Sequence, residues 1–208
     1  DPYATNYDET ATLDNGSCVG SIINPQDFVY AGALDGKFYY LSKYVMEWDD
    51  AAINCQNNYG QLVTVNSELE NLSLQEFIYT MHQAGNTITG GVWIGLSKVD
   101  GVWTWNSGEI FNYSNWNENE PSGDGDYVNM WITVGPEELG LWNDNPINAN
   151  WSHDGGIMSN GFKYLLEVDQ NLVLGCTDSY ALNYDETANV DDGSCEYSDF
   201  IGTIGPAG

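Results

Sequence analysis

The chain has 208 residues, with 31 acidic residues against four lysines and no arginine, for a formal net charge of -27. Phosphate binding needs clustered Lys and Arg, so this composition excludes nucleic acid and anionic membrane surfaces as partners and favours divalent cations. Hydrophobic residues make up 42% of the chain and aromatic residues 13%, which predicts a packed core and not an acidic disordered tail. No apolar run reaches the roughly 18 residues of a transmembrane helix, so we expect no membrane insertion.

One short acidic segment is written twice, as NYDETATLDNGSC at residues 6–18 and as NYDETANVDDGSC at residues 183–195. A repeat period this long indicates one domain between two copies of a small module, and not a solenoid. We therefore expect a truncated acidic module over residues 1–20, a central domain over 21–169, a second module over 175–195 and an apolar, Gly-rich tail over 196–208.

The cysteines fit this division. Cys176 and Cys195 bracket the second module, and a disulfide between them would restrain the unfolded chain by roughly 3 kcal/mol. Such a bond indicates an extracellular protein. The first module has Cys18 but no opening cysteine, so we expect Cys18 to find its partner outside this chain.

The second module is also rich in oxygen ligands, although their spacing is not that of an EF-hand loop. It is either a second calcium site or a disulfide-pinned spacer that binds no metal. The candidate ligands are Asp178, Asn183, Asp185, Asp191 and Asp192.

In the central domain, alternating and aromatic-rich residues predict a strand over 37–42. Apolar residues at helical spacing predict a helix that starts at Trp48, buries Cys55 and stops at Gly60, followed by a strand over 61–65. Ser67 and Glu70 form a capping box for a second helix that ends near residue 85. The apolar face expected for that helix contains Leu69, Leu72, Phe77, Ile78 and Met81.

Beyond Gly90 the helical pattern disappears. Short strands are predicted over 91–96, 101–105, 127–131 and 163–168, joined by long connections rich in Asn, Gly, Asp and Trp. Two helices followed by a loop-rich β region indicate an α+β fold.

Hard oxygen donors gather in the two long connections that flank the strand over 127–131. Calcium prefers six to eight oxygen ligands from carboxylates, amides and water, whereas a softer metal would want His or Cys. The alternative is a solvated acidic loop that binds no metal. The candidate calcium ligands are Glu120, Ser122, Asp124, Asp126, Asn143 and Asp144.

Five motifs follow the two helices in order: WIGL at 93–96, EPS at 120–122, DYV at 126–128, WND at 142–144 and YLLEV at 164–168. In this order they resemble a C-type lectin domain. The resemblance implies a double-loop α+β fold in which calcium coordinates two adjacent sugar hydroxyls. It nominates Glu120, Asn143 and Asp144 as ligands of both calcium and sugar, with a cis bond before Pro121. The Glu-Pro pair favours the mannose, glucose or fucose class over galactose.

The chain departs from the family pattern at several positions. Ser122 replaces an Asn ligand, and Gly125 stands where an acidic residue is frequent. Tyr127 and Leu166 stand at or near positions of the paired cysteines of animal members, which leaves Cys55 as a free buried thiol. This pattern is similar to bacterial members, and the flanking modules resemble Cys-bounded, Asp-rich repeats of secreted bacterial proteins. Candidates to stack on a sugar ring are Trp116, Trp131 and Trp151.

The leading hypothesis is a calcium-dependent, carbohydrate-binding adhesion protein that is secreted or exposed on a cell surface. An enzyme is not expected, because the carboxylate pair of Glu118 and Glu120 lacks a supporting base, nucleophile or cofactor motif. The alternative is a structural subunit of a self-assembling filament or tandem array. In that case the tail over 199–208 would add a strand to a neighbouring copy, head to tail.

Overall fold

A computed structural model describes residues 4, 7, 8, 10, 22–132, 139–148 and 161–198. The chain divides into two compact units, residues 1–169 and residues 170–208. Cys18, Trp151 and the tail over 199–208 lie outside the described residues, so the predictions made for them are not tested here.

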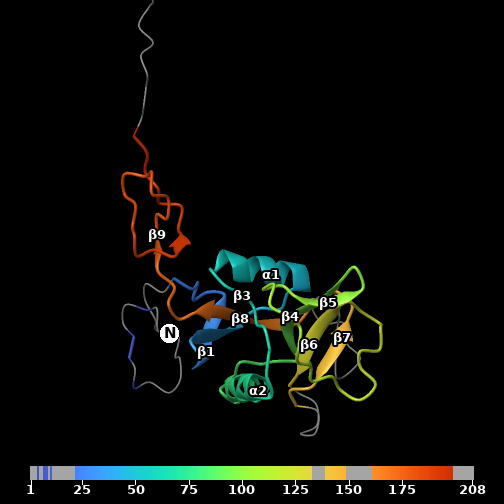
Figure 1. The fold of residues 1–208 in the computed structure, drawn as a ribbon. Coiled ribbons are helices and arrows are strands. Elements are labelled where there is room, and N and C mark those ends of the chain that lie inside the picture. The colour runs from blue at the N-terminus through green and yellow to red at the C-terminus, as the bar shows by residue number, and fades with distance from the viewer. Residues whose placement is uncertain are drawn as a thin grey trace, which may run out of the picture. The chain divides into compact units, whose positions relative to one another are not determined.

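The first unit is built on one sheet, which has eight strands in the described part of the chain (Figure 1). Its main path runs β1 (Phe28–Leu34), β2 (Lys37–Ser42), β8 (Lys163–Asp169), β4 (Gly91–Val99), β6 (Tyr127–Trp131) and β7 (Trp142–Asn145). The short strands β3 (Gln61–Leu62) and β5 (Val102–Trp105) pair with β8 and β4. Along the main path only the β4–β8 pair is parallel.

Two helices pack on this sheet, in agreement with the predicted α+β class. Helix α1 (Trp48–Asn57) contacts β3, β4 and β8, whereas α2 (Glu68–Gln83) contacts β1. Figure 1 shows the two helices on opposite sides of the strands. Helix α1 ends just before Tyr59, whose φ of 59° is left-handed. Ser67 caps α2 as predicted, because its Oγ accepts a hydrogen bond from the Glu70 N–H at 3.2 Å.

The expected buried face of α2 was partly wrong. Leu69 and Leu72 are 63% and 53% exposed. The buried residues are Asn71, Leu74, Ile78 and Met81, which follow the same helical period from a different starting point. A polar residue, Asn71, belongs to this stripe because it bonds to the core, and apolar pattern alone could not reveal that.

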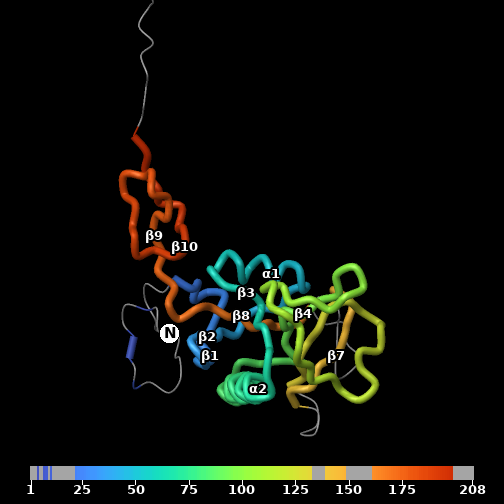
Figure 2. The backbone as a smooth tube through the Cα atoms, viewed as in Figure 1, coloured from blue at the N-terminus to red at the C-terminus, as the bar shows by residue number. Residues whose placement is uncertain are grey.

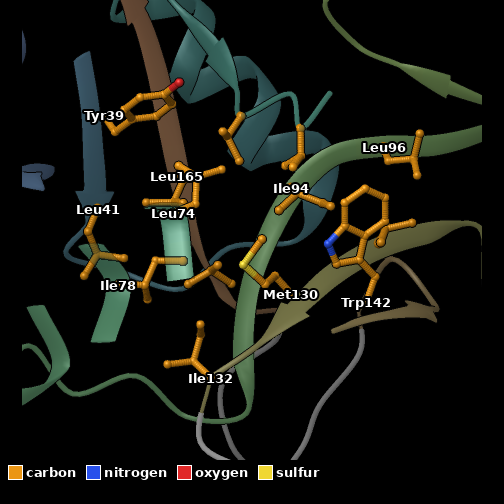
Figure 3. Packing of buried hydrophobic residues seen from close by; sticks show 14 of the residues in the cluster. Tyr39, Leu41, Leu74, Ile78, Ile94, Leu96, Met130, Ile132, Trp142 and Leu165 are labelled. Atoms are coloured by element: carbon orange, nitrogen blue, oxygen red, sulfur yellow. The ribbon is translucent and has the colours of Figure 1, made fainter. Parts of the chain in front are cut away.

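The core lies between α2 and the sheet (Figure 3). Leu74 and Ile78 of α2 point toward side chains of β2, β4, β6 and β8, among them Leu41, Ile94 and Leu165. Cys55 is a free and fully buried cysteine, as predicted, and burial raises the pKa of its thiol well above the ordinary value. It therefore acts as a small apolar residue of the helix–sheet interface.

An ion pair between the half-buried Lys37 and the buried Glu167 ties β2 to β8. The Glu167 carboxylate, 3% exposed, accepts hydrogen bonds from Lys37 Nζ at 2.5 Å and Gln61 Nε2 at 3.1 Å. Its second oxygen accepts the Thr64 N–H at 3.2 Å. The predicted strand over 61–65 is shortened to Gln61–Leu62. The Val63 N–H still donates to the Leu165 carbonyl at 3.0 Å, but the next amide, that of Thr64, bonds to a side chain and not to a neighbouring strand.

The second unit contains the acidic module and little regular structure. Strands β9 (Leu174–Gly175) and β10 (Val190–Asp191) form a short parallel pair. Cys176 and Cys195 are joined by a disulfide, as the sequence predicted. A search of the described residues found no helix with the length and hydropathy needed to cross a membrane.

Candidate functional site

The predicted oxygen donors lie where the long connection from β5 to β6 passes β7. Figure 2 shows this connection leaving the sheet and running beside β7. Asn117 N–H donates to the Trp142 carbonyl at 3.0 Å, and Trp142 N–H donates to the Asn115 carbonyl at 2.8 Å. The connection thus runs along β7 before it reaches Glu120, Pro121 and Ser122.

Trp142 fixes β7 in the core. Its side chain is fully buried among the rings of Trp105, Tyr113 and Trp116, at centroid distances of 5.7 to 5.8 Å. Its indole Nε1 donates to Asn71 Oδ1 at 2.8 Å, so α2 also holds the strand in position. The next two residues, Asn143 and Asp144, therefore start from a rigid backbone.

Glu120, Asn143 and Asp144, the three residues nominated as shared ligands, come together. One terminal atom of the Asn143 side-chain amide lies 2.6 Å from Glu120 Oε1 and 3.0 Å from Glu120 Oε2. The Asp144 carboxyl lies within hydrogen-bonding reach of Glu120. The bond between Glu120 and Pro121 is cis, as expected. Asn143 and Asp144 are both buried.

The two carboxyl groups influence each other's ionisation. Burial raises the pKa of Glu120, and its hydrogen bond with Asp144 raises that pKa further. Burial also opposes ionisation of Asp144, but hydrogen bonds from Glu120 and from backbone N–H groups outweigh burial and lower the pKa of Asp144. As the solution is acidified, the pair therefore takes up its first proton on Glu120.

The loop after Pro121 folds onto Asp144. The N–H groups of Ser122 and Gly123 donate to the Asp144 carboxylate at 2.7 and 2.8 Å, and Ser122 Oγ donates at 3.3 Å. Ser122 N–H also lies 2.8 Å from Glu120 Oε2. The hydroxyl predicted as a metal ligand is thus a hydrogen-bond donor to another ligand.

Gly125 explains one departure from the family pattern. A Cβ at this position would collide with the backbone of Asn145 and Pro146. The loop passes β7 so closely that no side chain fits, acidic or otherwise. The acidic residue that the family resemblance led us to expect here has no room in this chain.

Asp124 and Asp126 do not join the cluster as predicted. Asp124 is exposed. Asp126 is 62% exposed and lies 3.8 Å from Lys98 Nζ, on the β4 side of the loop. Both side chains are exposed to solvent, so the sequence placed more carboxylates at one centre than the structure brings together.

The donor set fits calcium in kind but is incomplete in number. Glu120, Asn143 and Asp144 offer hard oxygens, and no softer ligand is near them in the part of the chain that the structure describes. In the described part of the chain, no three Asp, Glu, His or Cys side chains gather into a metal-binding group. Water or ligand hydroxyls would have to complete a calcium shell here.

Trp131, the predicted stacking residue, lies on β6 close to this cluster. It is half-buried, and by strand alternation it shares a sheet face with Asn129, which pairs directly with Asn143. Asn129 and Asn145 are buried polar residues next to Asn143 that the sequence reading did not single out. Asn129 is the one polar, non-aromatic residue of β6, and β7 carries three consecutive polar residues after Trp142, which was the available signal.

The acidic module of the second unit gives its oxygens local partners. Four carboxylates each accept a hydrogen bond from the N–H two residues further on: those of Asp178, Asp185, Asp191 and Asp192. Asn183 instead bonds with Ser194 and Glu196. In the described part of the module, no three of its acidic side chains gather into a metal-binding group, so the second predicted calcium site stays a prediction.

The first acidic copy contains the same turn. Asp8 Oδ1 accepts from the Thr10 N–H at 2.9 Å and its Oγ1 at 2.7 Å. In the second copy Asp185 Oδ1 accepts from Thr187 at the same two distances. Where both copies are described, the repeated sequence thus makes a repeated structure, in which acidic residues act as turn formers.

Comparison with known proteins places the central domain. A family described as "Lectin C-type domain" matches residues 44–152. Lithostathine from Rattus norvegicus is 33% identical over 127 residues, which covers 59% of this chain and 73% of that protein. Lectin BRA-3 from Megabalanus rosa is 29% identical over 124 residues, which covers 58% of this chain and 65% of that lectin. The matched region thus spans just under two thirds of the barnacle protein.

Solved structures with this fold differ in their properties. Human lithostathine superposes with a TM-score of 0.54 at 24% identity, covering 66% of this chain and 95% of that one. A calcium-independent type II antifreeze protein superposes with a TM-score of 0.50 at 22% identity, covering 67% and 91%. The fold is therefore shared by proteins that do not depend on calcium. The family match extends over more than half of the 208 residues and agrees with the rat relative, so this chain belongs to the C-type lectin domain family.

Proposed function

We propose that this chain is an extracellular, calcium-dependent carbohydrate-binding domain. The observation that carries the proposal is the approach of the Asn143 amide to both Glu120 oxygens, at 2.6 and 3.0 Å, beside the buried Asp144 carboxylate. Three oxygen-bearing groups meet there, one from the loop before Pro121 and two from strand β7. The names of the relatives, as lectins, point to the same class of function.

Glu120, Asn143 and Asp144 would hold the calcium ion. The ion would supply coordination of two neighbouring sugar hydroxyls, and those hydroxyls would fill part of its oxygen shell. Trp131 would offer an apolar ring to the face of the sugar. The Glu-Pro pair favours mannose, glucose or fucose as the sugar class, whereas Ser122, engaged with Asp144, would add little to either partner.

A glycan array with and without EGTA tests this proposal, with isothermal titration of calcium as a second measurement. We expect calcium-dependent binding that Glu120→Gln and Asn143→Leu abolish. Asp126→Asn is the matched control, because it removes a carboxylate from the same loop but 62% of its side chain faces solvent. Binding that is unaffected by EGTA, or absent for every sugar, would refute the proposal.

An enzymatic role gains no support from the comparisons, because the relatives named above are not enzymes. The bacterial likeness drawn from Tyr127, Cys55 and the flanking modules is likewise only a proposal. The relatives named above are animal proteins and do not support it.

We propose a structural role as the second candidate, because the same acidic turn stands at Asp8 and at Asp185. A domain flanked by like modules suits a tandem array or a filament assembled head to tail. Negative-stain microscopy and light scattering of the full chain with calcium would test it. A strict monomer at high concentration contradicts this second candidate without touching the first.

A further inference from the structure

Three buried asparagines form a row that ends at the candidate calcium site. Asn129 of β6 pairs directly with Asn143 of β7, and Asn145 lies two residues further along β7. None is more than 4% exposed. Asn145 Nδ2 lies 2.6 Å from Asn129 Oδ1 and 2.9 Å from one terminal atom of the Asn143 amide. The other terminal atom of that amide faces Glu120.

The direction of one amide in this row constrains the others, because an amide has a donor end and an acceptor end. If Asn143 Nδ2 donates to Glu120, Asn143 Oδ1 accepts from Asn145 Nδ2. Asn145 Nδ2 then serves both of its neighbours. In this arrangement Asn129 Nδ2 has no hydrogen-bond partner, although the side chain is fully buried.

The opposite arrangement gives Asn129 Nδ2 a partner. With all three amides reversed, Asn145 Oδ1 accepts from both Asn143 Nδ2 and Asn129 Nδ2. Asn129 Oδ1 then faces Gly91. In the first arrangement Asn129 Nδ2 occupies this place, 2.5 Å from where a Cβ of residue 91 would lie. The exchange loses the 3.3 Å bond from Asn145 Nδ2 to the Asn143 carbonyl. The reversed arrangement also turns Asn143 Oδ1 toward the Glu120 carboxylate. These oxygens repel each other unless both coordinate a cation.

We propose that Asn129 and Asn145 are positioning residues that couple the direction of this amide row to cation binding at Glu120 and Asn143. Without a cation, the Asn143 amide turns its nitrogen toward Glu120, and Asn129 Nδ2 has no hydrogen-bond partner. With a cation, the row reverses, Asn143 presents its oxygen and the buried Asn129 N–H gains a partner. This inference rests on the proposed calcium site and identifies residues that tune it without touching the ion.

Calcium affinity of Asn129→Leu, a change of similar shape, tests the coupling. A lost hydrogen bond predicts an affinity about three- to tenfold weaker, although every ligand remains. The matched control is Asn58→Leu, which removes another buried asparagine whose Oδ1 accepts from the Asn24 N–H on the far side of α1. We expect Asn58→Leu to lower stability and leave calcium affinity unchanged.

A second measurement needs no variant. In wild-type protein, calcium should shift the side-chain NH₂ resonances of Asn129 downfield, since that group becomes hydrogen-bonded. If calcium perturbs Glu120 and Asn143 but leaves the Asn129 NH₂ unmoved, or if Asn129→Leu binds calcium like Asn58→Leu, the coupling is refuted while the calcium site stands. If the wild-type protein binds no calcium, the proposed function fails and the coupling fails with it.

Discussion

Asp144 holds the loop after Pro121 even without a metal ion, and this makes a sharp prediction. Its buried carboxylate accepts the N–H groups of Ser122 and Gly123 at 2.7 and 2.8 Å. Asp144→Asn replaces one oxygen with an NH₂ group, which must face one of these donors. The change loses one charge-assisted hydrogen bond and leaves a donor unpaired, so we expect the free energy of unfolding to fall by about 2 to 4 kcal/mol.

The assay is unfolding in EDTA, so that calcium contributes nothing. For a domain of this size, about 3 kcal/mol corresponds to a melting midpoint lower by roughly 6 to 12 °C. Ser122→Ala is the control, because it keeps both backbone donors and removes only the hydroxyl, which lies 3.3 Å from Asp144 and also bonds Glu120; it should cost less than about 1 kcal/mol. An Asp144→Asn protein as stable as wild type in EDTA would refute the reasoning, since Asp144 would then matter only as a ligand.

Three further predictions concern ionisation and cross-linking. Because burial and Asp144 raise the pKa of Glu120 above its ordinary value, a proton competes with calcium there, and affinity should weaken as the pH falls from 7 toward that pKa; affinities that stay equal on acidification, measured by titration calorimetry, would contradict this. Burial raises the pKa of Glu167 while Lys37 opposes that rise, so Lys37→Met should cost about 3 kcal/mol at pH 7. Because the folded-state pKa of Glu167 is raised, stability falls as pH rises, and the loss caused by Lys37→Met should shrink when urea unfolding is measured at pH 4.5. The loss should largely vanish when Glu167→Gln is combined with Lys37→Met. A loss independent of pH would contradict this prediction. Replacing Cys176 and Cys195 with Ala opens a loop with a sequence separation of 19 and should cost the second unit about 3 kcal/mol, with hydrogen exchange rising in residues 170–198 but not in the first unit; exchange unchanged in both would show that the disulfide is dispensable.

The sequence predicted the fold well because its strongest signals were local. A capping box at Ser67, alternating strands and the order of five short motifs each reflect contacts made within a few residues or a family-wide pattern. The disulfide between Cys176 and Cys195 followed from the repeat that they bracket. Strand β1 was missed, because its FVYAGAL sequence mixes small and aromatic residues without a clear alternation.

The candidate site was only half predictable, because its geometry depends on long-range contacts. Asp124 and Asp126 looked equivalent to Glu120 by composition, but in the structure both are exposed to solvent, and Asp126 lies beside Lys98. The partners of Asn129 and Asn145 come from strand register, which the sequence did not provide. In the second unit, the short-range bonds of Asp185 and its neighbours explain why a dense acidic segment need not make a metal site.

Glu120, Asn143 and Asp144 make mutual hydrogen bonds without a cation, and on our proposal the same three residues would also bind calcium. Asp144 is already held by backbone N–H groups, and Asn143 can donate to Glu120 in place of a metal contact. Calcium binding would then require no change in the loop backbone. Glu120 would have to lose its proton or its hydrogen bond from the Asn143 amide, and the three buried asparagine amides would have to reverse. Dependence on calcium would therefore be decided less by the number of acidic residues than by which end of the Asn143 amide the neighbouring strands turn outward.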